Sequence, residues 1–118
     1  MTGAFIFLCL AATAVDGDTL RCSNLDAPQN AGGRVRLARI DAPERGQPGA
    51  REATAALALL IEGHEVRCTL VDADPRRAGF QRTDRYRRPV ARCEAGGLDL
   101  GKELIRRGHA VRWPAGRR

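Results

Sequence analysis

Aromatic residues and lysine are both scarce in this sequence. Phe, Trp and Tyr make up 4% of the 118 residues, so the core has to be built from Leu, Val, Ile and Ala. Lys102 is the only lysine, and arginine supplies the rest of the twenty basic residues, which outnumber fourteen acidic ones and give a net charge of +6. The planar arginine fork suits a phosphate partner, whereas a GC-rich genome would produce the same bias without a functional cause. Composition alone leaves both explanations open.

The sequence lacks the patterns of several other classes of protein. No Cys-x-x-Cys pair is present, and His64 and His109 are too scattered to complete a zinc finger. The apolar run AFIFLCLAATA is too short to span a bilayer, and no basic residues precede it as they would in a signal peptide. No repeat or low-complexity linker divides the chain, so we expect a single domain over residues 1–118.

Four cysteines are present, at positions Cys9, Cys22, Cys68 and Cys93. An even number of cysteines in a small domain favours two disulfides and an oxidising compartment, and three pairings are then possible. Free, buried thiols are the alternative.

Short apolar segments separated by turns predict five strands and about two helices. The expected strands cover residues 4–15, 19–25, 34–40, 64–71 and 89–94. A helix is expected from residue 50 up to Gly63, which would stop it, and a second over 100–107 with Asp99 as its N-cap. This order indicates an α+β fold, a five-stranded OB-fold (Greek-key) β-barrel with about two packed α-helices.

Acidic residues stand at turns and strand ends of this basic chain. Asp18 closes the hairpin turn Asp16-Gly17-Asp18-Thr19, and Asp41 and Glu44 follow the third expected strand. Two aspartates from adjacent strand ends could hold a hard cation such as Ca²⁺. Nearby stretches supply the arginines that phosphodiester hydrolysis needs to neutralise the phosphate, namely Arg36, Arg85, and the Arg87–Arg88 pair beside Tyr86. Each of these residues alone is also a common turn or surface residue.

Four segments, in this order and spacing, resemble the staphylococcal nuclease (thermonuclease) family: VDGDTL, RVRLARIDAPE, QRTDRYRRPVA and LGKELIRRGHA. The resemblance covers about residues 14–113. It implies a five-strand OB barrel with helices and a Ca²⁺-dependent nuclease that cleaves DNA and RNA to products with 3′-phosphate ends. We therefore expect single-stranded DNA and RNA as partners, no membrane partner, a monomer, and a secreted or periplasmic location, although no clear secretion signal is recognised in the sequence.

The resemblance also assigns roles to individual residues. Asp18 and Asp41 match the two metal aspartates, and Ala42 takes the place whose backbone carbonyl is the third protein ligand. Glu44 matches the glutamate that activates the attacking water. Arg36 and Arg88 match the arginines that grip the scissile phosphate and stabilise the transition state.

The match is less regular in the substrate loop and near the C-terminus. Asp84, Arg85 and Tyr86 correspond to the loop that contacts the nucleotide. Arg87 replaces a glycine; if φ is positive there, the side chain is strained and could displace Arg88, and the opposing expectation is an added phosphate contact. Trp113 lies close to the aromatic that stacks on the base, but is not plainly at its position.

The fold that the resemblance implies also suggests how the cysteines pair. Cys9 and Cys22 flank the first hairpin, while Cys68 and Cys93 fall on neighbouring strands, so Cys9–Cys22 and Cys68–Cys93 are the expected disulfides.

The sequence thus predicts a Ca²⁺-dependent nuclease. The alternative is a catalytically inactive OB-type nucleic-acid-binding module, favoured by Arg87 and by the missing stacking aromatic. A purely structural domain would explain neither Arg36 nor the acidic set.

Overall fold

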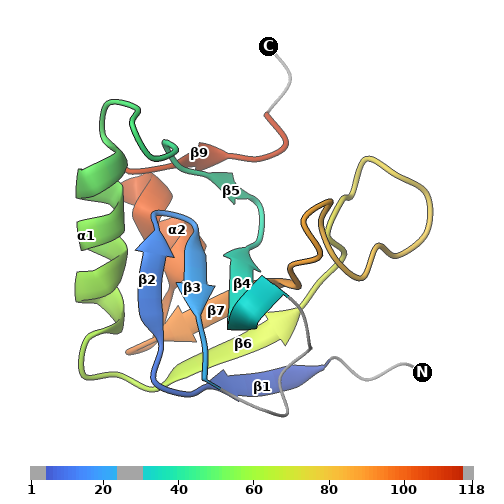
Figure 1. Cartoon of the computed structure of the whole chain (residues 1–118), viewed down its shortest axis with the longest axis horizontal. Coiled ribbons are helices and arrows are strands. Elements are labelled where there is room, and N and C mark those ends of the chain that lie inside the picture. Colours follow the sequence, from blue (N-terminus) through green and yellow to red (C-terminus); the bar gives the residue numbers. More distant parts are fainter. Residues whose placement is uncertain (1–4, 24–30, 116–118) are drawn as a thin grey trace.

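The computed structural model describes residues 5–23 and 31–115. Within them the chain forms two α-helices, nine short strands and one 3₁₀ turn (Figure 1), so the fold is α+β as expected. The strands are β1 (Ile6–Cys9), β2 (Thr13–Asp16), β3 (Thr19–Arg21), β4 (Arg34–Leu37), β5 (Ile40–Asp41), β6 (Val66–Leu70), β7 (Val90–Ala95), β8 (Leu98–Asp99) and β9 (Val111–Arg112). The helices are α1 (Ala50–Ile61) and α2 (Leu100–Arg106), and the 3₁₀ turn is Ala31–Gly33.

The main sheet has the order β1-β6-β7-β4-β3-β2, and β8 adds to β7. Its pairs are antiparallel except for β4 and β7, which are parallel. The two outermost strands, β1 and β2, follow one another in the chain, so the sheet curls back on itself (Figure 1). Among the described strands the hydrogen-bonded path does not close, and this curled mixed sheet is consistent with the expected OB-like fold. β5 and β9 make a separate two-stranded ladder.

Two of the expected strands are each broken into two by a residue in the left-handed region. Ala11 has φ 48° and separates β1 from β2, so the expected strand 4–15 pairs with β6 at one end and with β3 at the other. Arg39 has φ 66° and separates β4 from β5 in the same way. The expected strand 19–25 ends at Arg21, and its residues 24 and 25 lie outside the described part.

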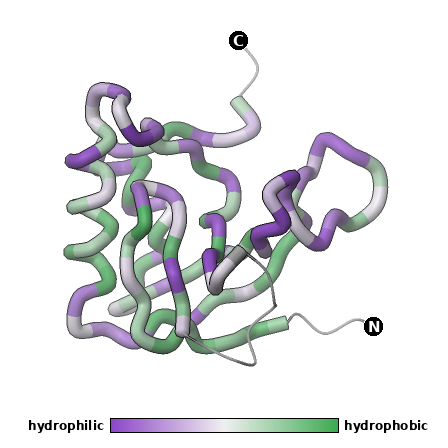
Figure 2. The backbone as a smooth tube through the Cα atoms, viewed as in Figure 1, coloured by the Kyte–Doolittle hydropathy of each residue, from purple (hydrophilic) through white to green (hydrophobic). Residues whose placement is uncertain are grey.

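The core is aliphatic, as the shortage of aromatics requires. Its largest fully buried side chains include Leu20, Leu37, Ile40, Leu57, Leu100 and Leu104. Helix α1 packs against β2 and α2 and buries residues spaced three and four apart, namely Ala53, Ala56, Leu57, Leu60 and Ile61. Figure 2 shows that hydrophobic residues recur along α1, and that many residues of the long loop between β6 and β7 are hydrophilic.

The predicted end of α1 and the predicted start of α2 are both confirmed. Gly63, with φ 74°, comes directly after the extended Glu62 that ends α1. Asp99 caps α2 by accepting a hydrogen bond from the backbone N–H of Lys102 (3.0 Å). None of the described helices is long and apolar enough to cross a membrane.

The structure contains both expected disulfides, Cys9–Cys22 and Cys68–Cys93, so no described cysteine is free. Cys9 ends β1 and Cys22 follows β3, so the first bond ties the start of the chain to the first hairpin. Cys68 and Cys93 stand opposite one another in the β6–β7 ladder.

Candidate active site

A cleft of about 560 Å³ lies between the ends of the central strands and the β6–β7 loop. All but two of the eleven predicted site residues other than cysteines line it, namely Asp18, Arg36, Asp41, Glu44, Asp84, Arg85, Tyr86, Arg88 and Trp113. Ala42 and Arg87 are not part of its lining. Six arginines and six carboxylates line the cleft altogether.

Asp18 is held at the base of the cleft by the β2–β3 hairpin. A Cβ at Gly17 would lie 2.6 Å from that of Ala53, so glycine is what allows the hairpin to pack against α1. Asp18 Oδ2 then accepts a hydrogen bond from the backbone N–H of Ala42 (2.9 Å). Asp18 is only 8% exposed, and its burial raises the pKa of the carboxyl to about 6, because the desolvation outweighs the attraction of Arg36.

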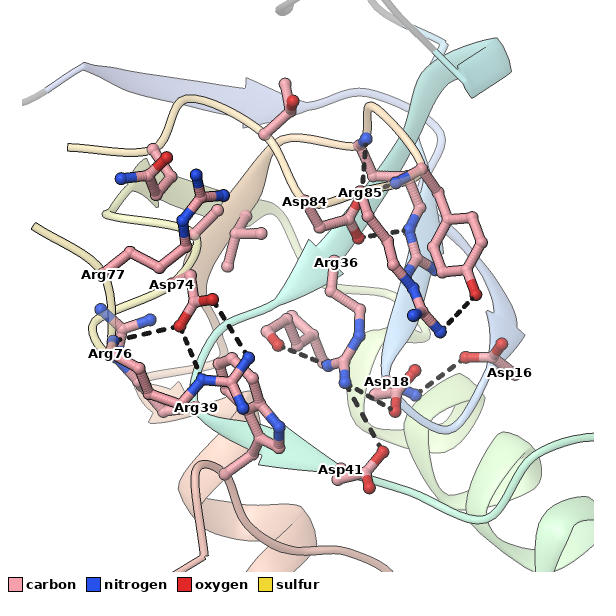
Figure 3. Close-up of a pocket in the computed structure, with 18 of the residues that line it drawn as sticks. Asp16, Asp18, Arg36, Arg39, Asp41, Asp74, Arg76, Arg77, Asp84 and Arg85 are labelled. Carbon is pink, nitrogen blue, oxygen red and sulfur yellow. Dashed lines mark hydrogen bonds and ion pairs between the residues drawn. The ribbon is translucent and has the colours of Figure 1, made fainter. Parts of the chain in front are cut away.

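Arg36 links the two predicted metal aspartates. Its NH1 donates to the carbonyls of Leu37 and Ile40, at 2.8 and 2.9 Å, which lie on either side of the tight turn at residues 38 and 39. Its NH2 lies 3.4 Å from Asp18 Oδ2 and 3.6 Å from Asp41 Oδ1 (Figure 3). The backbone carbonyls thus hold one edge of the guanidinium, and the other edge bridges two carboxylates.

Glu44 enters the cleft from the loop that leads to α1. Its backbone N–H donates to the side-chain oxygen of Gln47 (2.7 Å), and the N–H of Gln47 donates back to the carbonyl of Glu44 (2.8 Å). The Glu44 carboxylate itself has no hydrogen bond or ion pair with any described residue. The carboxylate is exposed in the cleft and therefore open to water or a ligand.

Asp84 fixes the position of Arg88, the second arginine predicted to bind the phosphate. Its Oδ1 accepts hydrogen bonds from the backbone N–H groups of Tyr86 and Arg88, both at 2.9 Å, and its Oδ2 lies 2.7 Å from Arg88 Nε. Arg88 is therefore fixed by a paired carboxylate on the same turn. Its NH1 is 3.2 Å from the hydroxyl of Thr19.

Arg87 has φ 64°, so the position does require the conformation that glycine adopts most easily. With Arg87 in this conformation, Arg88 donates hydrogen bonds to Asp84 from its backbone N–H and from its Nε. Arg87 itself is exposed and does not line the cleft.

The Tyr86 ring lies beside two arginines. The guanidinium carbon of Arg85 lies 4.9 Å from the ring centroid and that of Arg88 lies 5.3 Å from it. Arg85 NH2 also donates to the Tyr86 hydroxyl (2.8 Å). Tyr86 is 59% exposed and lines the cleft, so its ring remains accessible.

Several residues of the cleft were not predicted. Asp16 accepts the backbone N–H of Asp18 (3.0 Å), and its place in the Asp-Gly-Asp turn could have indicated that role. Four further charged residues of the cleft lie in the turn at residue 39 and in the β6–β7 loop, and no periodic pattern in the sequence places that loop. They are Arg39, Asp74, Arg76 and Arg77.

The sequence model of the family described as staphylococcal nuclease homologue matches residues 34–116. The chain belongs to this family. No curated protein sequence matches it significantly. The match includes Arg36, Asp41, Glu44 and Arg88, while Asp18 lies before it and is joined to the same cleft by its ion pair with Arg36. Membership in the staphylococcal nuclease family indicates a nuclease or nucleic-acid-binding function.

The calcium ion that the family resemblance implies needs hard oxygen ligands. Among the described residues, no three His, Cys, Asp or Glu side chains gather in a metal-binding group. Asp18 and Asp41 supply two carboxylates that converge on a single cationic point, now held by Arg36 NH2. Desolvation also raises the pKa of the buried Asp18 carboxyl, and a bound cation would stabilise the charged form and lower this pKa. The Asp18 and Asp41 carboxylates are hard oxygen donors of the kind that calcium takes in proteins.

Proposed function

We propose that this protein is a nuclease that hydrolyses phosphodiester bonds of DNA and RNA in the presence of Ca²⁺ and leaves 3′-phosphate ends. The observation that carries the proposal is the position of Arg36, whose NH2 lies within 3.6 Å of both Asp18 and Asp41 in the cleft that Glu44 and Arg88 also line. Family membership supports the same reaction class.

In this proposal the arginines act on the phosphate and Glu44 acts on water. Arg36 and Arg88 bind the nonbridging oxygens and neutralise the charge that grows in the transition state. Glu44 accepts a proton as the water oxygen bonds to phosphorus. The bond from phosphorus to the 5′ oxygen breaks, and that oxygen leaves as a hydroxyl after taking up a proton.

The Asp18 and Asp41 carboxylates, with the Ala42 carbonyl, would hold the calcium ion. When bound, calcium supplies Lewis-acid stabilisation of the phosphate. Asp18 is well suited to a fixed ligand role because the N–H of Ala42 and the hydroxyl of Thr19 orient its two oxygens.

Asp84, Arg85 and Tyr86 would contact the nucleotide. The Tyr86 ring is exposed beside two guanidinium groups, a combination that stacks on a base while the cations follow the phosphates. Such contacts carry no base code, so we propose broad specificity.

We further propose a secreted or periplasmic location. Two disulfides in so small a domain support an oxidising compartment. All candidate site residues come from one chain, so a monomer would suffice for activity.

The test is cleavage of labelled single-stranded DNA and RNA by purified protein with Ca²⁺ or with a chelator. We expect cleavage only with Ca²⁺, loss of cleavage in Glu44→Gln, and normal cleavage in Glu65→Gln, which removes an exposed carboxylate away from the cleft. Products should resist extension by a polymerase until a phosphatase removes the 3′-phosphate. Retention of an intact strand with or without Ca²⁺ would instead identify a nucleic-acid-binding module. A protein that neither cleaves nor retains the strand would have neither function.

A further inference from the structure

The cleft extends beyond the proposed reaction centre onto the loop between β6 and β7. In Figure 3, Arg39, Asp74, Arg76 and Arg77 lie on one side of Arg36, while Asp84 and Arg85 lie on the other. The roles proposed so far use the side of Asp84 and Arg85. The opposite side carries three arginines to which no role has been given.

Two of these three arginines have no carboxylate partner. Arg76 is paired with Asp74, but no carboxylate oxygen of the described residues lies within 4.0 Å of Arg39 or Arg77. Arg39 NH1 donates to the carbonyl of Asp72 (2.8 Å), which fixes its direction and leaves its charge uncompensated. Arg77 is exposed at the rim. Both retain donors for a phosphate group.

Trp113 lies next to these arginines. Its backbone N–H donates to the carbonyl of Arg39 (2.9 Å), so the two residues are joined across the β5–β9 end of the cleft. The guanidinium carbon of Arg76 is 4.9 Å from the indole centroid. Asp74 holds that guanidinium through Nε–Oδ1 (2.9 Å) and NH2–Oδ2 (3.1 Å) contacts. One face of the indole is thus covered by a cation whose charge is already balanced.

The two parts of this arrangement suit different parts of a nucleotide. The Arg76–Trp113 stack is a planar surface with little net charge, because Asp74 pairs with the guanidinium, and such a surface suits a nucleobase. Arg39 and Arg77 provide net positive charge beside it, which suits a phosphodiester. Together they have the chemistry of one nucleotide with its phosphate.

We propose that Arg39 and Arg77 bind the phosphate of a second nucleotide, next to the one at the reaction centre, while Trp113 stacks on its base. The ligand class is therefore a single-stranded oligonucleotide of at least two linked nucleotides. The inference rests on the proposed function only in taking a nucleic acid strand as ligand, because it concerns binding and needs no cleavage.

Trp113 is the only tryptophan, so its fluorescence reports on this part of the cleft alone. Wild-type protein is titrated in chelator, where cleavage is blocked, with thymidine 3′,5′-bisphosphate and with thymidine strands of two, three and four nucleotides. We expect fluorescence quenching and an affinity that rises about tenfold or more between the mononucleotide and the three-nucleotide strand.

The variant Arg39→Gln/Arg77→Gln is compared with Arg51→Gln/Arg67→Gln, which removes the same charge from exposed positions outside the cleft. Arg39→Gln/Arg77→Gln should lose most of the increase in affinity that the wild type shows with longer strands. The slope of log K against log salt should also fall by about 0.7, since the two arginines bind one phosphate and each phosphate contact on a single strand contributes about 0.7. The control should keep the length dependence.

Arg77→Gln alone guards against a folding defect, because the Arg77 side chain makes no hydrogen bond or ion pair with a described residue, whereas Arg39 donates to the carbonyl of Asp72. It should still reduce the slope, by less than the double variant does. A strand with one uncharged methylphosphonate linkage gives a second check. Wild type should lose affinity when the neutral linkage falls at this subsite, and the double variant should be indifferent to it.

The proposal is overturned if wild-type affinity does not depend on strand length, or if the double variant matches the control in affinity and slope. These outcomes are independent of the nuclease assay. Loss of cleavage with intact length-dependent binding would reject the proposed function and leave this subsite standing.

Discussion

Arg88 reaches across the cleft to Thr19, with its NH1 3.2 Å from the Thr19 hydroxyl oxygen. The same oxygen lies 3.2 Å from Asp18 Oδ1, and Thr19 is fully buried. A hydroxyl has one proton, so it donates to the carboxylate and accepts from the guanidinium. Thr19 thus couples the arginine proposed to bind the phosphate to the aspartate proposed to bind calcium.

Replacing Thr19 by valine keeps the shape of the side chain and removes this link. We expect Thr19→Val to lower kcat/KM by about tenfold or more, because Arg88 and Asp18 each lose a charge-assisted hydrogen bond. Thr19→Ser should restore most of the activity. Thr54→Val is the control, since its hydroxyl bonds only to the Ala50 carbonyl in α1. Equal activity of Thr19→Val and wild type, measured well below both melting temperatures, would show that the link has no catalytic role.

Asp18→Asn should make the calcium-free protein more stable while it removes the proposed activity. The raised pKa of about 6 shows that the charged carboxylate is unfavourable in its buried position. Neutralising it should increase the free energy of unfolding by about 1 to 3 kcal/mol at pH 8, because one pKa unit is worth about 1.4 kcal/mol. Urea denaturation in chelator measures the change.

Asp41→Asn is the matched variant, because that side chain is 54% exposed and has little desolvation to relieve. It should lose activity without gaining stability. A decrease in stability for Asp18→Asn would mean that its hydrogen bonds to Ala42 and Thr19 outweigh the cost of its burial.

Arg87→Gly relieves a side chain from the left-handed region, and Arg87→Ala removes the same charge without relieving the backbone. The strain is about 1 kcal/mol, and the greater freedom of glycine in the unfolded chain offsets about 0.5 to 1 kcal/mol of the gain. We therefore expect Arg87→Gly to be more stable than Arg87→Ala by less than about 1 kcal/mol. Activity should change little in either, because Asp84 already fixes Arg88. A large rise in activity for the glycine variant alone would show that Arg87 does distort the loop.

The two disulfides should each stabilise the fold by limiting the unfolded chain. Their sequence separations of 13 and 25 correspond to about 3 and 3.5 kcal/mol on the chain-entropy estimate. Paired Cys→Ala variants should therefore show lower melting temperatures, with the Cys68–Cys93 variant at least as strongly affected. Calorimetry of both, with and without reductant, checks this. Reductant should lower the melting temperature of each variant further, since one bond remains in each.

Glu103 should make the protein sensitive to acid. Its carboxylate accepts hydrogen bonds from Arg106 and Arg107, and these hold its pKa at about 2, below the ordinary value of 4.5. The folded state therefore binds fewer protons than the unfolded state between these values. The stabilisation is present above pH 4.5 and is lost as the pH falls towards 2. Glu103→Gln should have a flatter stability profile in that window, as thermal melts from pH 2 to 6 would show. Parallel profiles would contradict the assignment.

The helices and the acidic turns could be predicted because residue type and spacing determine them locally. Leu57 and Leu60 lie on the periodic apolar face of α1, and Asp99 caps α2 from its own sequence position. The breaks at Ala11 and Arg39 could not be predicted, since neither residue type favours a positive φ. Arg39 matters most, because its turn creates β5 and brings Asp41 back to Arg36.

The loop between β6 and β7 was the least predictable part of the candidate site. Nothing in the spacing of Asp74, Arg76 and Trp113 indicates that they meet, because the contact depends on how β9 pairs with β5. The family resemblance assigns Asp84 to the nucleotide-contacting loop and Arg88 to the phosphate, but the role of Asp84 in fixing Arg88 emerges only from the three hydrogen bonds that Asp84 accepts from Tyr86 and Arg88.

The six arginines of the cleft face six carboxylates, so the cleft is formally neutral although the whole chain carries +6. Long-range attraction of a polyanion must therefore come from the basic residues outside the cleft. A divalent cation between Asp18 and Asp41 would then tip the interior to positive and favour entry of the phosphate. The first encounter with a strand would depend on the basic residues outside the cleft and would therefore weaken as ionic strength rises. Entry of the phosphate into the reaction centre would depend on calcium instead.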